Sequence, residues 1–116
     1  MTVEADIYNA LKSLTANRVY RDVAPDSVTA LPRITFQQVG GQSVNFLETT
    51  APSRKNARFQ VNAWGADRDS VAVLSRQIEN AMRVILATVL AAPVAVYEYE
   101  TKLYGTHQDF SIWHTD

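Results

Sequence analysis

Residues 67–90 carry the clearest hydrophobic period in the chain, and this pattern constrains the fold more than any other feature. Apolar side chains recur at spacings of three, four, three and four, in the order Val71, Leu74, Ile78, Ala81 and Ile85. The spacing predicts an amphipathic helix, for which the preceding Asp67 is a suitable N-cap. The opposite face carries the polar residues Arg76, Gln77, Asn80 and Arg83. Such a helix must bury its apolar stripe, so the chain has to supply a second layer.

The size of the chain limits the length of this helix. A globular protein of this size has a radius of gyration of about 13 Å, whereas a helix over residues 67–90 would be about 36 Å long. We therefore expect the helix to end near Ala87, or its apolar tail to project from the body. Pro93 forces a stop by Ala92, because the residue before a proline disfavours the helical conformation.

The remaining patterns predict a second helix and several strands. Val3, Ile7, Leu11 and Leu14 form one helical stripe near the N-terminus, which Thr2 can cap. Strand patterns occupy residues 18–22, 33–39, 57–65, 94–100 and 107–114. Alternation within the strands predicts which side chains meet the long helix. We expect Leu74, Ile78 and Ile85 to pack on Ile34, Phe36, Phe59, Val61, Phe110 and Ile112, and the polar residues Gln37, Gln60 and Asn62 to face away.

The order of these elements predicts an α+β fold. We expect one domain over residues 1–116, with an antiparallel sheet of about four to five strands and two helices packed on one face. Turn-forming residues and two prolines between residues 23 and 32 predict a loop through which the chain re-enters the sheet. Residues 40–56 have no period and predict a long loop or a hairpin arm. A turn is expected near Lys102, and Gly105 is either an alternative turn or a bulge.

Composition and charge exclude several classes of protein. The net charge is −1 and no block of Lys or Arg is present, which argues against a general nucleic-acid binder. Without cysteine the chain forms neither disulfides nor thiolate metal sites. The apolar run 84–96 is too short for a bilayer, and the N-terminus lacks the order of a signal peptide. These features predict a cytoplasmic product that binds neither nucleic acid nor a membrane.

No set of side chains predicts a catalytic, cofactor or metal site. The candidate pairs are His107 with His114, Glu98 with Glu100, and Asp67 with Asp69. The histidines differ by seven positions and would point to opposite faces of one strand. The two glutamates fit a solvated strand face, and capping explains the two aspartates. The pair Gly40–Gly41 lacks the lysine and helix of a phosphate loop. We therefore expect no enzyme, no cofactor and no bound metal.

Several short signatures, taken in order, resemble a known family. They are "RVY" (18–20), "AP" (24–25), "LPRITF" (31–36), "QVNAW" (60–64) and "DFSIW" (109–113). Together they are similar to the small tail-completion, or tail-to-head joining, proteins of long-tailed bacteriophages and prophages. The resemblance runs from the first helix to the last strand. It implies an α+β fold related to tail terminators, and a structural protein that forms a hexameric ring at the head-proximal end of the tail.

The resemblance also implies partners and a location. The partners are the tail tube protein, the head-connector protein and further copies of the chain. We expect a largely monomeric chain in isolation, because ring closure before assembly would waste subunits. The location is the host bacterial cytoplasm during assembly and then the tail or neck of the virion. No functional residue is carried over, since the shared signatures look structural.

From the residues themselves, three regions are candidates for assembly contacts. They are the apolar segment 84–90, the long loop and any unpaired edge of the sheet. Within the loop we expect contacts from Phe46, Leu47, Glu48, Arg54 and Lys55. Two other classes remain open at this point: a stand-alone α+β binding or regulatory module, which needs a pocket with convergent polar groups, and a small hydrolase or isomerase, which needs an acid–base pair in a cleft.

Overall fold

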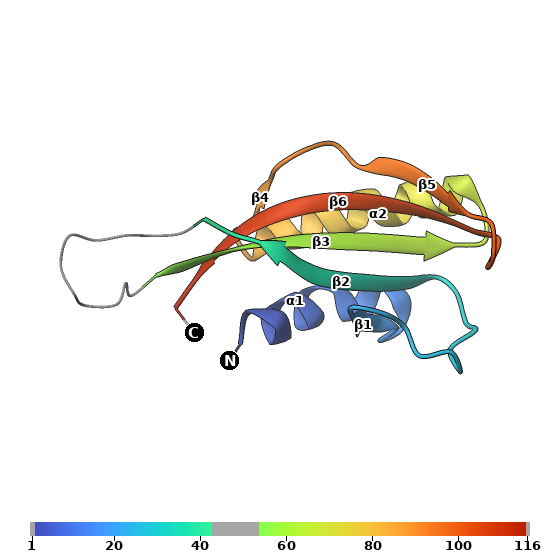
Figure 1. Cartoon of the computed structure of the whole chain (residues 1–116), viewed down its shortest axis with the longest axis horizontal. Helices are drawn as coiled ribbons and strands as arrows, with labels where there is room; N and C mark the ends of the chain where they lie inside the picture. Colours follow the sequence, from blue (N-terminus) through green and yellow to red (C-terminus); the bar gives the residue numbers. More distant parts are fainter. Residues whose placement is uncertain (1, 43–53, 116) are drawn as a thin grey trace.

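The computed structural model describes residues 2–42 and 54–115 of the chain. The elements, in chain order, are α1 (Val3–Leu11), the 3-10 helix η1 (Lys12–Thr15), β1 (Val19–Arg21), β2 (Arg33–Gly40), β3 (Lys55–Gly65), α2 (Arg68–Val84), β4 (Thr88–Val89), β5 (Val94–Glu98) and β6 (Leu103–His114). The six strands of the described chain form one sheet in the order β1, β2, β3, β6, and both β4 and β5 pair with the outer edge of β6. The body is elongated, 51 × 26 × 26 Å, with the long strands and α2 along its length (Figure 1).

Both helices pack on the same face of this sheet. Val3, Ile7 and Leu11 of α1 join the apolar stripe of α2 in one buried core with the sheet. The α+β class and the one-sided placement of the helices are therefore confirmed. The long strands β3 and β6 pair antiparallel over their whole length, from Lys55 opposite His114 to Gly65 opposite Tyr104. The helix α2 packs on these two strands, and α1 packs against α2 and β1.

The sheet is mixed rather than purely antiparallel, and it has one strand more than expected. β1 runs parallel to β2, with Val19 opposite Ile34. The connecting residues 22–32 are long enough to carry the chain back to the start of β2, as a parallel pair requires. The additional strand is β4, which has two residues and lies inside a continuous apolar run. A strand this short leaves no alternation in the sequence.

Both predicted helix caps are present. The backbone N–H of Ala5 donates to Oγ1 of Thr2 at 3.1 Å, and that of Ser70 donates to Oδ1 of Asp67 at 2.8 Å. Each bond satisfies one of the backbone donors that a helix leaves unpaired in its first turn. The hydrogen bonds from the Ser70 backbone, and then from its side chain, hold the pKa of the Asp67 carboxyl below its ordinary value of 3.8.

The long helix ends at Val84 and has no projecting tail. Leu86 adopts a left-handed conformation with φ of 66°, and the N–H of Ala87 donates to the carbonyl of Met82 at 3.1 Å. These features turn the chain back along the sheet, where β4 begins. Of the two expectations for residues 84–90, the early stop is the one observed. Val84 and Leu86 lie on the surface and are 80% and 86% exposed.

The predicted core is confirmed with small differences. Leu74 and Ile78 are buried, and Ile85 is partly buried against the same cluster. All six sheet residues expected beneath the helix are buried, namely Ile34, Phe36, Phe59, Val61, Phe110 and Ile112. The fully buried Met82 was not expected; it lies between Ile78 and Ile85 and widens the apolar stripe there. The opposite helix face is exposed, as predicted, at Arg76, Gln77, Asn80 and Arg83.

Two local expectations were wrong. Gly105 lies inside β6 rather than in a turn or bulge, and a Cβ there would come within 2.6 Å of the Trp64 ring. This close approach explains a glycine in the middle of a strand. Glu100 does not share a strand face with Glu98, because β5 ends at Glu98 and Glu100 belongs to the turn that follows. The turn itself contains Lys102, as expected.

Candidate assembly surfaces

The face of the sheet opposite the helices holds a connected polar network. Nδ2 of Asn62 donates to Oγ1 of Thr35 at 3.2 Å, and Nε1 of Trp64 donates to the same oxygen at 3.1 Å. Nδ1 of His107 makes a short contact with Oδ1 of Asn62, and the His107 ring meets Trp64 edge-on at 5.9 Å. Thr35 and Asn62 are each only 6% exposed. Three strands thus hold a rigid polar floor without a covering helix.

A groove of about 670 Å³ lies over this floor. One wall is the loop between β1 and β2, with Asp22, Asp26 and Leu31, and the other is the turn after β5, with Glu98 and Thr101. The guanidinium of Arg33 donates to the carbonyl of Val28 at 3.0 Å and holds the first wall in place. The groove supplies polar groups and carboxylates, but the polar atoms of the network beneath it, from Thr35, Asn62, Trp64 and His107, already bond one another.

The residues expected to make assembly contacts are only partly described. Phe46, Leu47 and Glu48 lie outside the described residues. Arg54 and Lys55 are exposed where β3 begins, and the guanidinium carbon of Arg54 lies 5.2 Å from the centre of the Trp113 ring. This arrangement is a cation–π contact between the start of β3 and the end of β6.

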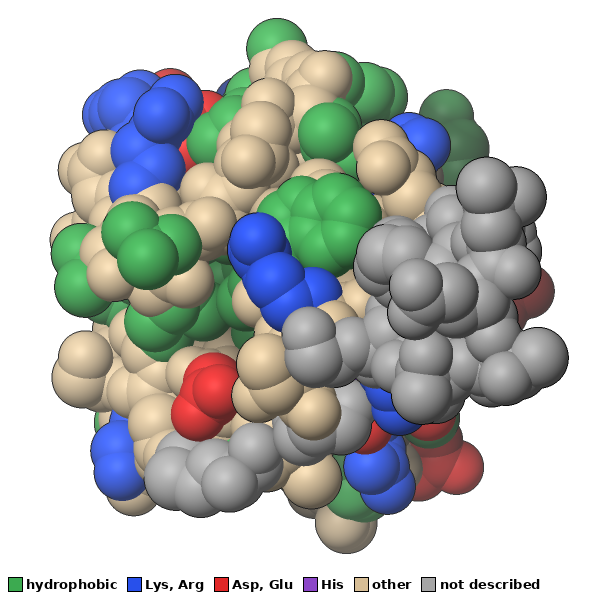
Figure 2. Space-filling view, turned by 90° about the vertical axis from the view of Figure 1, so that its left-hand side faces the viewer, with side chains coloured by type: hydrophobic (Ala, Val, Ile, Leu, Met, Phe, Trp, Pro, Cys, Tyr) green, Lys and Arg blue, Asp and Glu red, His purple; other side chains and the backbone are tan. Residues whose placement is uncertain are grey.

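The edge of the sheet formed by β4 and β5 is apolar and exposed. We define the apolar edge as Val84, Leu86, Leu90, Val94, Tyr97 and Tyr99, which are between 39% and 86% exposed. Residues 84–97 contain no charged side chain. Figure 2 views the end of the molecule near β4, and hydrophobic side chains gather in the upper half of that face. The predicted candidate segment 84–90 is thus divided, with Ile85 and Ala87 turned toward the core.

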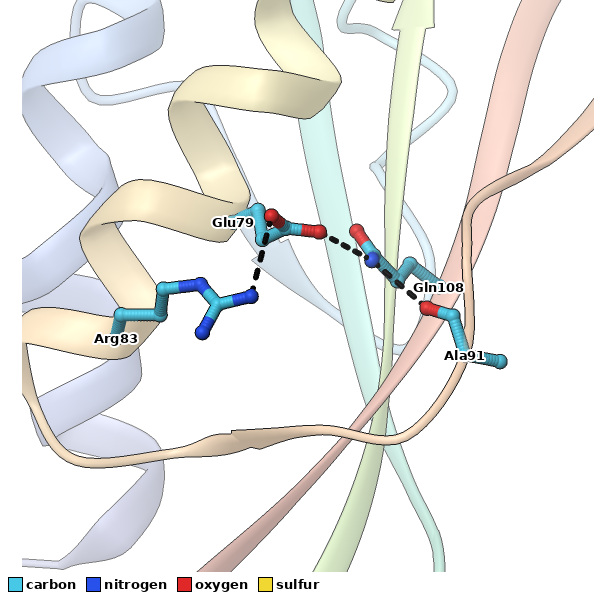
Figure 3. Close-up of polar contacts among 4 residues, drawn as sticks. All are labelled: Glu79, Arg83, Ala91 and Gln108. Atoms are coloured by element: carbon cyan, nitrogen blue, oxygen red, sulfur yellow. Dashed lines mark hydrogen bonds and ion pairs between the residues drawn. The ribbon is translucent and has the colours of Figure 1, made fainter.

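The side chain of Gln108 connects this edge to α2 through hydrogen bonds. Its Nε2 atom donates to Oε1 of Glu79 on α2 at 2.9 Å and to the carbonyl of Ala91 at 2.9 Å (Figure 3). Glu79 also pairs with Arg83 at 3.5 Å. Gln108 is 3% exposed, and its Oε1 atom has no hydrogen-bond partner within the described chain. The side-chain amide holds the arch between β4 and β5 where the backbone ladder is interrupted.

The side chain of Arg68 connects β5 to the start of α2. The Arg68 guanidinium donates to the carbonyls of Val96 at 2.7 Å and Gly105 at 2.8 Å. Its central carbon lies 5.2 Å from the centre of the Tyr104 ring. Arg68 therefore ties the start of α2 to both strands of the β5–β6 hairpin. Sequence reasoning found neither Arg68 nor Gln108, because their partners are 17 to 37 residues away in the chain.

The candidate chemical residues do not converge. His107 lies on the open face with Asn62, whereas His114 belongs to the opposite face of β6, as its odd separation predicts. Among residues 2–42 and 54–115, no three His, Asp or Glu side chains gather so that they could hold a metal ion. Within the same ranges, no helix is both long and apolar enough to cross a membrane.

Comparison with known proteins gives one clear result. A family model described as "Tail completion protein gp17" matches residues 6–115, which is nearly the whole chain. No curated protein sequence matches the chain significantly. The match begins within α1 and covers α2 and every strand described above.

Proposed function

This chain belongs to the tail completion protein gp17 family of phage tail proteins, and we propose that it completes the head-proximal end of a phage tail as a hexameric ring and joins the tail to the head. In this proposal one side of the ring meets the tail tube protein and the other meets the head-connector protein. Assembly takes place in the host cytoplasm, and the ring remains in the virion neck. The role is structural rather than catalytic.

The observation that best supports a joining role is the difference between the two ends of the elongated body. Three connections meet at the end that is on the right in Figure 1: the β1–β2 loop, the start of α2 and the β5–β6 turn. At this end they carry carboxylates on Asp26, Asp67, Asp69, Glu98 and Glu100, together with one exposed cation, Lys102. Arg33 and Arg68 near this end direct their guanidinium groups to backbone carbonyls. A protein that joins two different partners needs two different ends.

The opposite end carries basic side chains. Arg54 and Lys55 are exposed there, where β3 begins. The contacts proposed for Arg54 and Lys55 would therefore meet a different partner from the one at the acidic end, and those proposed for Phe46, Leu47 and Glu48 remain a prediction outside the described residues. An acidic end favours a basic partner surface and disfavours an acidic one, which gives the joint a fixed direction.

Deletion of the gene tests this function. We expect cells that produce the particles without this chain to accumulate filled heads and free tails, seen by electron microscopy, and a supplied wild-type chain to restore joining. As a control, a chain with Lys in place of both Asp26 and Glu98 should fold normally and restore joining poorly. Joined particles of normal appearance in the complete absence of the chain would contradict the proposal.

The state of the isolated chain is a separate part of this proposal. We expect native mass spectrometry at micromolar concentration to show mainly monomer, because the tail end would act as the template for ring closure. A dominant hexamer without any partner would contradict the template requirement, although it would agree with the ring.

A further inference from the structure

Exposed large apolar side chains are concentrated on the two opposite edges of the sheet. Ten such residues are exposed in the described chain; six form the apolar edge along β4 and β5, and two, Val23 and Val39, lie on the β1–β2 edge. The other two are Val73 on α2 and Trp113 near the C-terminus. Contiguous exposed apolar surface marks contact sites, and an apolar edge on one side with the exposed Val39 on the opposite side fits a head-to-tail contact between copies.

The strand register places β4, on one edge of the sheet, and the bulge of β2, on the other edge, at the same level along the strands. Across the sheet, Thr88 of β4 pairs with Ser111 of β6, and Ser111 pairs with Arg58 of β3. Arg58 in turn pairs with Gly40 of β2, so Thr88 and Gly40 are at the same level along the strands. By the same route Val89 is level with Gln38. Val39 sits in the bulge between Gln38 and Gly40, so it is level with β4 on the far side of the sheet. A neighbouring copy in a ring is rotated, and a rotation about an axis parallel to the strands keeps this level along the strands. Such a copy would set its Val39 beside Thr88 and Val89 of β4, next to Leu90.

Strand direction agrees with this placement. β4 is antiparallel to β6, β6 to β3, and β3 to β2, so β4 and β2 run in opposite directions. A neighbouring copy rotated about an axis parallel to the strands keeps its strand directions, so it would offer an antiparallel strand to β4. Within the described chain, β4 and β5 pair only with β6, and residues 37–40 of β2 extend beyond β1. Unpaired strand edges of this kind are templates for association with another chain.

The apolar edge is also held in a fixed shape. Gln108 fastens the arch at Ala91, and Arg68 fastens β5 at Val96. A surface that is already ordered loses little conformational entropy on binding. These hydrogen bonds come from the buried Gln108 and the partly buried Arg68, whose side chains point inward. The outer side of the edge is therefore free for contact.

From these observations we propose that the apolar edge binds a second copy of this chain at its β1–β2 edge, with Leu90 of one subunit beside Val39 of the next. The proposal rests on the ring of the proposed function and supplies its subunit contact. Each subunit uses both edges once, so the contact repeats around the ring and leaves the two ends of the body for the tail and the head.

Cysteine cross-linking tests the pairing directly, because the chain contains no cysteine. Tails are prepared with Val39→Cys, Leu90→Cys or both, oxidised with copper phenanthroline and separated on a non-reducing denaturing gel. We expect the double variant to give a ladder of multimers that a reductant collapses, and each single variant to remain at the monomer mass. Dimers from Leu90→Cys alone would indicate a twofold contact and overturn the proposal.

The remaining outcomes separate this proposal from the proposed function. If the double variant is incorporated normally but gives no ladder, the contact is wrong while the function stands. If wild-type tails contain no copies of the chain, the proposed function fails and the contact fails with it.

A charge substitution provides a second measurement. Leu90 and Val73 have matched exposure, 43% and 46%, but Val73 lies on α2 away from both edges. Leu90→Glu would place a carboxylate in the apolar contact, so we expect incorporation into tails to fall by at least about tenfold. Val73→Glu should be incorporated like the wild type, and thermal melts should show both variants folded. Equal incorporation of the two variants would overturn the proposal.

Discussion

The two faces of the sheet bury their residues in different ways. On the covered face, α1 and α2 exclude water from apolar side chains such as Phe59 and Phe110. On the open face, Thr35 and Asn62 reach 6% exposure, the same as Ile112 on the covered face, with no helix above them. Neighbouring Trp64 and His107 shield them, and hydrogen bonds satisfy their polar groups. The covered face thus supplies most of the hydrophobic stability, while the open face combines a rigid floor with an accessible groove.

The largest effect is expected on the covered face. Ile78→Ala should destabilise the protein by about 2–5 kcal/mol, because it removes buried methyl groups and leaves a cavity. The neighbouring exposed Gln77→Ala should change the free energy of unfolding by less than about 0.5 kcal/mol. Urea denaturation of the two variants measures the difference. Equal effects would mean that the apolar stripe of α2 does not face the sheet.

The next effect tests the packing of the open face. Gly105→Ala should destabilise the protein by about 1–3 kcal/mol, since the added Cβ meets the Trp64 ring and the strand cannot move away freely. The cost of Gly105→Ala should be smaller when Trp64 is replaced by Phe, whose ring is smaller. Thermal denaturation of the four proteins in this double-mutant cycle gives the coupling. No coupling between the two positions would contradict the close contact.

A smaller effect is expected from the polar network itself. Asn62→Ala removes the bond to Thr35 and the partner of His107, and it should cost about 1–2 kcal/mol. Gln60 lies two residues away on the same face and makes no side-chain hydrogen bond within the described chain, so Gln60→Ala is the matched control. Its effect should stay below about 0.5 kcal/mol. If denaturation shows the two variants to be equally stable, the network does not contribute to folding.

The smallest effect is expected at the start of α2, outside both faces. The folded-state pKa of Asp67 is lowered, so its ionised form stabilises the protein above the ordinary pKa of 3.8, and this contribution disappears as the pH falls through the folded-state pKa. Asp67→Asn keeps a capping side chain without the titration. From about pH 5 to about pH 2, the melting temperature of the wild type should fall slightly more than that of the variant. Parallel curves would exclude this linkage.

Local patterns predicted the covered face well. Three confirmed features depend on residues close together in the chain. They are the apolar stripe of α2, its Asp67 cap and the placement of Ile34 and Phe36, two positions apart, on one face of β2. The family resemblance drawn from short signatures is confirmed as well. The stripe and the placement of the strand residues follow from helix and strand periods, which need no knowledge of the tertiary register.

The open face and the sheet edges could not be predicted in the same way. Asn62 bonds to Thr35 across 27 residues and contacts His107 across 45. Such pairs become neighbours only when strand register is fixed, and a single sequence does not fix it. The parallel pairing of β1 and the short β4 also depend on tertiary placement. The apolar edge was foreseen only as a candidate segment, because its exposed and buried residues alternate within one apolar run.

Reconstruction of the head–tail junction by electron cryo-microscopy would show the proposed ring and its subunit contact directly. We expect a hexameric ring of this chain between tail tube and head connector, with Leu90 of each subunit beside Val39 of the next and the two ends of the body turned toward different partners. A junction without this chain, or a ring in which the apolar edge faces solvent, would contradict it.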